Sequence, residues 1–204
     1  KVLEVKPYAC FGCPIACGRS TTIKEGPYAG MHGGGPEYES VAAFGSKCLV
    51  TDINAVAAAN HFSNDLGLDL ISTGQVIATA MEWYENGILT PEAAGGLALT
   101  WGNGDAVVKA VQLIGHREGV GDLLALGVKR AAERLGPAAE TAALHVKGLE
   151  MPADGVRASK GEAIVHATSA RGADHLRPYA SCIDAFGYRE AELGIEGDID
   201  FLKD

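Results

Sequence analysis

The stretch that decides the fold spans residues 51–87 and reads TDINAVAAANHFSNDLGLDLISTGQVIATAMEWYENG. Its apolar residues recur every three to four positions, which is the period of an amphipathic helix. Asp52 predicts the cap of a first helix, and Gly67 predicts its end. Ser72 or Thr73 predicts the cap of a second helix. Two consecutive helices therefore form the centre of the expected architecture.

The rest of the chain adds helices on one side and irregular structure on the other. A third helix is predicted after Asn103, and a fourth from about Gly121 to Gly136. Residues 1–50 are rich in glycine and proline, so we expect loops with short strands there. The helical pattern lapses after the fourth helix, and we place a domain boundary near residue 147. The expected fold class is mainly α, multi-helical, with few short strands.

Composition excludes several classes of protein. The 204 residues are 47% hydrophobic, which is ample for a buried core. A net charge of −9 disfavours nucleic-acid binding, since phosphate contacts need a basic face. No apolar run approaches the roughly 18–20 residues of a membrane span. Five cysteines cannot all pair within the chain, which fits a cytoplasmic location. Both ends read as interrupted, so we expect a piece of a longer protein.

A cluster of cysteines near the start of the chain predicts a metal centre. Cys10, Cys13 and Cys17 form a C-x2-C-x3-C pattern. Soft thiolates at this density favour an iron–sulfur cluster over zinc, which usually has a second ligand arm, and over a chance grouping. A four-iron cluster needs a fourth ligand. Cys48 and Cys182 qualify by count, but each stands alone in apolar sequence, and a cysteine beyond the end of this chain fits better.

Two further segments carry carboxylates that suit chemistry or ligand binding. Residues 33–40 read GGGPEYES, where either Glu37 or Glu39 could act as a general base in a cleft. The simpler alternative is a glycine-rich turn before a helix. Residues 64–69 read NDLGLD and lie between two predicted helices, where a ligand rich in N–H donors, such as a pterin, would fit. Ordinary helix capping by Asp69 is the alternative.

The third polar segment, residues 171–177, reads RGADHLR. Arg171 and Arg177 could clamp phosphates, and His175 beside Asp174 could donate or accept a proton. A solvated charged loop is the alternative. The remaining histidines lack paired metal-ligand spacing and are taken as structural: His32, His61, His116, His145 and His166.

Taken in order, these segments resemble the aldehyde ferredoxin oxidoreductase family, the tungsten or molybdenum bis-pterin enzymes. The cysteine segment resembles the family's cluster-binding loop, GPEYES its GPEYE segment, and GLDLISTG its GLDxIStG stretch. Three further matches complete a collinear series over nearly the whole chain: residues 117–124, 147–152 and 167–177.

The resemblance implies a domain organisation. Residues 1–146 correspond to a helical middle domain that carries the cluster loop, and residues 147–204 to the truncated start of a C-terminal domain. The family's N-terminal β domain is absent from this sequence, and its tungstopterin lies between the three domains. We therefore expect these residues alone to be inactive and to hold neither a complete 4Fe-4S cluster nor a pterin.

The resemblance also assigns roles to residues. The family's catalytic glutamate matches best at Glu39, with Glu37 as the alternative, and its catalytic histidine matches His175. Cys10, Cys13 and Cys17 match the cluster ligands.

The cofactor contacts follow in the same way, with two departures from the family pattern. Asn64, Leu68 and Asp69 match the first of two pterin-binding segments, and we take Arg171 as a further cofactor contact. Asn64 replaces the family's usual aspartate, so one carboxylate–pterin bond becomes an amide bond. The segment ending at His61 lacks the glutamate that helps to bind a bridging metal in some members, so we predict no such metal.

The implied function is that of an oxidoreductase. The full-length enzyme is expected to oxidise aldehydes to carboxylic acids and to pass electrons through a tungsto- or molybdopterin and a 4Fe-4S cluster to ferredoxin. The alternatives are a ring-reducing or other-substrate member of the family and a non-catalytic zinc- or cluster-binding module. We expect no nucleic-acid or membrane partner, and the resemblance leaves a homodimer open.

Overall fold

The computed structural model describes residues 2–181, 183, 192 and 194. Within this part the chain forms eight α-helices, one π-helical turn and five short strands, so the predicted mainly α class is confirmed. The elements, in order, are β1 (Leu3–Tyr8), β2 (Gly18–Ile23), β3 (His32–Gly34), α1 (Tyr38–Val41), η1 (Ala42–Ser46), α2 (Ile53–Asp65), α3 (Leu70–Glu85), α4 (Gly104–His116), α5 (Val120–Leu124), α6 (Val128–Leu135), α7 (Pro137–Glu140), β4 (His145–Val146), β5 (Leu149–Glu150) and α8 (Lys160–Thr168).

Side-chain caps begin the three long helices. Asp52 caps α2 by accepting the Asn54 N–H at 2.9 Å, and Asn103 caps α4 by accepting the Ala106 N–H at 3.1 Å. Both caps match the sequence prediction. The predicted cap of α3 was wrong. Asp69 is the cap and accepts the Ser72 N–H at 2.7 Å, so the helix begins earlier than expected.

Two other helices differ from the prediction. The expected fourth helix is split into α5 and α6, because Gly127 adopts a left-handed conformation with φ of 79° that a continuous helix cannot contain. Helix α8 was not predicted at all. Its buried residues include Glu162 and His166, so it lacks the apolar stripe by which an amphipathic helix is found in a sequence.

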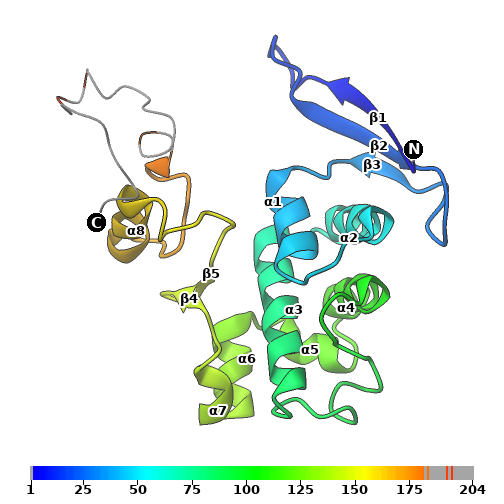
Figure 1. Ribbon diagram of the computed structural model, residues 1–204, viewed down its shortest axis with the longest axis vertical. Coiled ribbons are helices and arrows are strands. Elements are labelled where there is room, and N and C mark those ends of the chain that lie inside the picture. The colour runs from blue at the N-terminus through cyan, green and yellow to red at the C-terminus, as the bar shows by residue number, and fades with distance from the viewer. Residues whose placement is uncertain (1, 182, 184–191, 193, 195–204) are drawn as a thin grey trace.

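Helix α3 forms the centre of the core (Figure 1). Ile77, Met81 and Trp83 on this helix are completely buried, and the Trp83 Nε1–H donates to the carbonyl oxygen of Ala139 at 3.0 Å. This bond joins α3 to α7. Helices α2, α4 and α5 lie to one side of α3 in Figure 1, and α6 and α7 lie to the other. No helix in the described part of the chain combines the length and apolar character that crossing a bilayer requires.

Helices α4 and α5 approach so closely that only glycine fits at one position. A Cβ at Gly121 would lie 2.1 Å from the carbonyl carbon of Leu113 and 2.6 Å from the amide nitrogen of Ile114. These are backbone atoms, which cannot move aside as a flexible side chain can. We expect Gly121→Ala to destabilise the full-length protein by about 1–3 kcal/mol, the usual cost of overpacking.

Urea unfolding followed by circular dichroism checks this expectation. Gly45→Ala is the matched control, because a Cβ there would meet its nearest neighbour at an ordinary 3.6 Å. An unfolding midpoint for Gly121→Ala equal to that of the control would show that α4 and α5 are not packed as described.

A three-stranded antiparallel sheet in the order β1-β2-β3 stands at one end of the helices (Figure 1). Its last strand lies directly on α2, because a Cβ at Gly33 would lie 2.8 Å from Nδ1 of His61 and one at Gly35 2.8 Å from Oδ1 of Asn60. Gly35 also has a φ of 81°, which favours glycine. The glycines that precede α1 thus allow β3 to pack closely against α2.

Candidate active site

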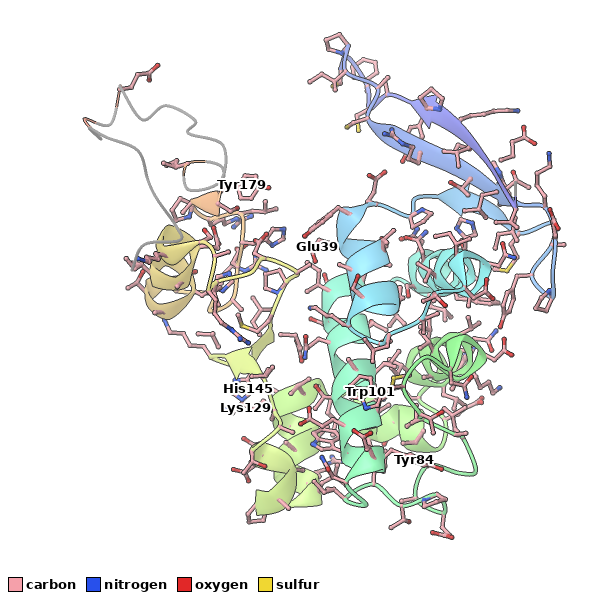
Figure 2. All side chains as sticks on the ribbon, in the orientation of Figure 1. Glu39, Tyr84, Trp101, Lys129, His145 and Tyr179 are labelled. Carbon is pink, nitrogen blue, oxygen red and sulfur yellow. The ribbon has the colours of Figure 1, made fainter. Side chains whose placement is uncertain are left out.

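Helix α1 presents the two candidate glutamates in different surroundings. Glu37 is the exposed N-cap residue, and its N–H donates to Oγ of Ser40 at 3.4 Å. Glu39 is half-buried on the side of α1 that faces the C-terminal segment (Figure 2). Its carboxylate accepts the Ala153 N–H at 3.2 Å and 3.0 Å through its two oxygens. The two glutamates therefore differ in burial, and only Glu39 is partly shielded from solvent.

The electrostatic environment of Glu39 suits a proton acceptor. Burial raises the pKa of this carboxyl above its usual value, because the charged form is poorly solvated. The Ala153 N–H and the positive charges of His175 and Lys47 act in the opposite direction. A raised carboxyl pKa in a partly enclosed position is a common property of catalytic acids and bases.

His175 lies in the loop that follows α8. It is half-buried, and its ring packs edge-on against Tyr179 with the centroids 6.4 Å apart. Its charge acts on Glu39 of α1 and on Glu162 of α8. Glu39 and His175, which are far apart in the sequence, are therefore within electrostatic reach of each other.

The arginine predicted as a cofactor contact has a protein partner. Nη1 of Arg171 lies 2.8 Å from Oδ2 of Asp174, and Nε of Arg177 lies 3.9 Å from the same oxygen. Asp174 is buried. The hydrogen bond from the Leu176 N–H is the main cause that holds the pKa of this carboxyl below its usual value, and the two guanidiniums lower it further. The guanidinium of Arg171 is thus engaged in fixing the loop that carries His175, which the sequence prediction did not foresee.

Lys47 is a neighbour of the site that the sequence did not indicate. Its Nζ donates to the carbonyl oxygen of Met151 at 2.5 Å, and burial lowers the pKa of the ammonium. It lines a cavity of about 290 Å³ together with Tyr38, Val41, Ala42, Ser46, Pro152 and Ala153. This cavity lies between helix α1 and the segment after β5, beside Glu39.

The predicted pterin-binding residues lie where α2 ends and α3 begins. Asn64 is exposed, and its Nδ2–H donates to the carbonyl oxygen of Gly34 at 3.1 Å. Asp69 is exposed and uses one carboxylate oxygen to cap α3. For that oxygen, helix capping, which was the alternative to ligand binding, is confirmed. Leu68 is half-buried against the core.

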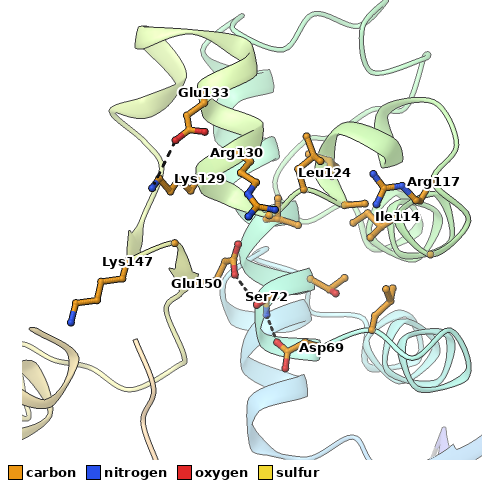
Figure 3. Close-up of a pocket in the computed structure, with 18 residues that line it drawn as sticks. Asp69, Ser72, Ile114, Arg117, Leu124, Lys129, Arg130, Glu133, Lys147 and Glu150 are labelled. Atoms are coloured by element: carbon orange, nitrogen blue, oxygen red, sulfur yellow. Dashed lines mark hydrogen bonds and ion pairs between the residues drawn. The ribbon is translucent and has the colours of Figure 1, made fainter. Parts of the chain in front are cut away.

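Leu68 and Asp69 also line a cavity of about 670 Å³, which Figure 3 shows at the first turn of α3. Beside them, Glu150 of β5 accepts the Ser72 hydroxyl at 2.8 Å and the Val128 N–H at 2.7 Å. The rest of the lining combines apolar residues and glycines with Glu133 and four basic side chains, which are Arg117, Lys129, Arg130 and Lys147. Such a lining suits a polar ligand that carries both N–H donors and anionic groups.

The three clustered cysteines lie on the loop between β1 and β2. All three are free thiols, with Cys10 and Cys17 exposed and Cys13 half-buried, and the Cys13 N–H closes a turn to the carbonyl oxygen of Cys10 at 3.0 Å. The apolar side chains of Phe11 and Ile15 beside them are exposed. Three soft donors on one thin loop fit a cluster ligand set that lacks one member.

Cys48 has the surroundings of a buried structural residue. Its side chain is completely buried and its thiol donates to the carbonyl oxygen of Ala43 at 3.4 Å. Burial raises the pKa of this thiol to about 12, whereas a cluster ligand is a thiolate. Cys182 lies outside the described residues.

Cys48→Ala should therefore leave the iron content of the full-length protein unchanged, because no thiolate ligand is removed. Iron and acid-labile sulfide per chain check this expectation. Loss of iron from the Cys48→Ala protein would instead identify Cys48 as a cluster ligand.

Comparison with known proteins fixes the family. The sequence model described as "Aldehyde ferredoxin oxidoreductase, domains 2 & 3" matches residues 1–202. The chain belongs to the aldehyde ferredoxin oxidoreductase family. It is 40% identical over 185 residues to the tungsten-containing aldehyde ferredoxin oxidoreductase of Pyrococcus furiosus, and this match covers 90% of the chain. The corresponding protein of Thermococcus kodakarensis is 37% identical over the same share.

Two further proteins that are similar to this chain have different names. The aliphatic sulfonate oxidoreductase, WOR-like subunit, of Pyrococcus furiosus is 35% identical over 189 residues. The active site complex BamBC of benzoyl coenzyme A reductase, solved with 1,5-dienoyl-CoA, superposes with a TM-score of 0.64. That likeness covers 81% of this chain and 24% of the solved chain at 24% identity, and it concerns the fold. The present chain spans about 30% of the length of the curated relatives.

Proposed function

We propose that the full-length protein oxidises aldehydes to carboxylic acids and transfers the electrons to ferredoxin. The names of the most similar relatives support this substrate and this partner. The observation that carries the proposal is the placement of Glu39 and His175. A half-buried carboxyl with a raised pKa stands within the electrostatic reach of an imidazole that comes from a different segment of the chain.

The donor sets of the described residues fit the cofactors of such an enzyme. Cys10, Cys13 and Cys17 would hold three irons of a 4Fe-4S cluster, with a fourth ligand from elsewhere in the protein. Asp69 would accept N–H groups of a pterin, since a carboxylate has acceptor capacity beyond its capping bond, and Asn64 and Leu68 would flank it. A tungsten or molybdenum bis-pterin supplies the oxygen-transfer and two-electron chemistry when it is bound.

Glu39 and His175 would manage the protons of the reaction. Oxidation of an aldehyde consumes a water molecule and releases protons with two electrons. Glu39 would accept a proton from that water, because its raised pKa makes its carboxylate a better base than an exposed one. His175 would donate a hydrogen bond to the carbonyl oxygen of the aldehyde, which would polarise the carbonyl bond. Ala153 and Lys47 restrain and tune Glu39.

The direct test is anaerobic purification of the full-length protein with analysis of iron, sulfide, tungsten and molybdenum, followed by assays with aldehydes and ferredoxin. We expect iron with sulfide, one of the two heavier metals, and aldehyde-dependent reduction of ferredoxin. A protein that contains only stoichiometric zinc would contradict the proposal and support a non-catalytic module. A protein that contains its cofactors and reduces ferredoxin with sulfonates but not with aldehydes would change the proposed substrate class to sulfonates, as in the name of the aliphatic sulfonate oxidoreductase relative.

A further inference from the structure

A second cluster of ionisable side chains lies outside the site described above, on α8 and the loop that precedes it. Asp154, Glu162 and His166 each offer a ligand atom, and the three atoms lie within 4.8 Å of one another. Glu162 and His166 are four residues apart, so both project from the same face of α8. Asp154 reaches them from the loop after β5.

Burial distinguishes this cluster from a solvated charged surface. Glu162 is 0% exposed and His166 is 2% exposed, while Asp154 is half-buried. Charged side chains are rarely buried so completely unless they are paired or bind a metal. Burial and the short separation of the three ligand atoms thus set this cluster apart from a solvated charged surface.

Several donor atoms of the cluster remain unused. Oε2 of Glu162 accepts the Ser181 N–H at 3.0 Å. Among the described residues, however, no hydrogen-bond partner exists for Oε1 of Glu162, Oδ2 of Asp154 or either ring nitrogen of His166. Nε2 of His166 lies 3.3 Å from Oε1 of Glu162 without forming a hydrogen bond. Buried polar atoms without hydrogen bonds indicate a missing ligand when one atom from each of three residues lies this close to the others.

We propose that Asp154, Glu162 and His166 bind a divalent transition-metal ion, with Zn²⁺ as the ion that fits the donor set best. Zinc takes imidazole nitrogen and carboxylate oxygen at about 2.0–2.2 Å in tetrahedral geometry. Two such bonds at the tetrahedral angle place their donor atoms roughly 3.3–3.5 Å apart, in agreement with the 3.3 Å between His166 and Glu162. Mg²⁺ and Ca²⁺ prefer oxygen donors, so the imidazole disfavours them.

An ion at this place would act on the neighbouring active-site candidate through the backbone. Ala153, whose N–H holds the carboxylate of Glu39, directly precedes Asp154. Tying Asp154 to α8 restrains that N–H, and the bond between Ser181 and Glu162 ties the segment after His175 to the same helix. The bound ion has a positioning role, and its binding does not depend on which reaction the enzyme catalyses.

Zinc content provides the test. The full-length protein is stripped with EDTA, incubated with Zn²⁺, dialysed, and analysed by plasma mass spectrometry. Glu162→Gln and His166→Gln remove ligands, and His116→Gln is the matched control on an exposed histidine of α4. We expect the wild type and His116→Gln to retain one zinc per chain more than the other two variants. Zinc held by the cysteine loop is the same in all four proteins and cancels from the comparison.

The comparison has a definite negative outcome. Equal zinc content in all four folded proteins would overturn the proposal and leave Glu162 and His166 as an ion pair. If the helix variants do not fold, Asp154→Asn replaces them, because Asp154 lies on a loop and an amide of the same shape disturbs the packing least. A folded Asp154→Asn protein should lack the extra zinc. Retention of that zinc by this variant would also overturn the proposed site.

Discussion

Glu39→Gln in the full-length enzyme should lower kcat by roughly 10²–10⁴-fold, the usual contribution of a general base. The amide keeps the shape and half-buried position of the side chain, but it cannot accept a proton. His175→Asn should have an effect of the same size, because the imidazole is the group proposed to polarise the carbonyl. Steady-state kinetics with an aldehyde measures both effects, provided that iron, metal and pterin contents equal those of the wild type.

Glu37→Gln is the matched control for Glu39→Gln. Glu37 is the exposed N-cap residue of the same helix, two residues away from Glu39, so its replacement should change kcat much less. A severe loss in Glu37→Gln with little loss in Glu39→Gln would shift the catalytic assignment by two residues. Near wild-type kcat in all three variants would make both candidate residues structural.

Cys13→Ser should remove most of the iron from the full-length protein and abolish reduction of ferredoxin. Cys13 is the middle of three free thiols on a thin loop, so its loss leaves a cluster without one of its soft ligands. The pterin contacts proposed at Asp69 lie on α3 and should survive, so tungsten or molybdenum should remain bound. Iron analysis and the visible spectrum measure the first effect, and ferredoxin reduction measures the second.

The control for Cys13→Ser is Cys48→Ala, which removes a buried thiol and should leave iron unchanged. A Cys13→Ser enzyme with wild-type iron content and full turnover would show that the cysteine loop does not hold the cluster.

Local signals explain what could be predicted of the fold. Asp52 and Asn103 stand directly before apolar periodic segments, and both cap helices as expected. The cap of α3 was misplaced because Ser72 and Thr73 are favoured cap residues, as Asp69 is. The sequence alone does not show that Asp69 is the residue with extended backbone angles. Helix α8 escaped prediction because its interior face carries Glu162 and His166.

The candidate site, like the fold, could be predicted from the sequence only in part. The resemblance favoured Glu39 over Glu37, and the structure supplies a physical difference between them in burial and in the bond from Ala153. That bond joins residues 114 positions apart, and no local pattern predicts it. The spacing of Glu162 and His166 was visible in the sequence as an i, i+4 pair. It became informative only when burial and the approach of Asp154 were known.

The pH dependence of kcat/KM tests the role of Glu39 most directly. Its pKa is raised by burial above the usual value near 4.5. The active form is the carboxylate, so the rate should rise with pH through that elevated pKa and level off above it. We predict this acid limb in the wild type and in Glu37→Gln, and its loss from the residual activity of Glu39→Gln. An identical acid limb in Glu39→Gln would show that another group is the base.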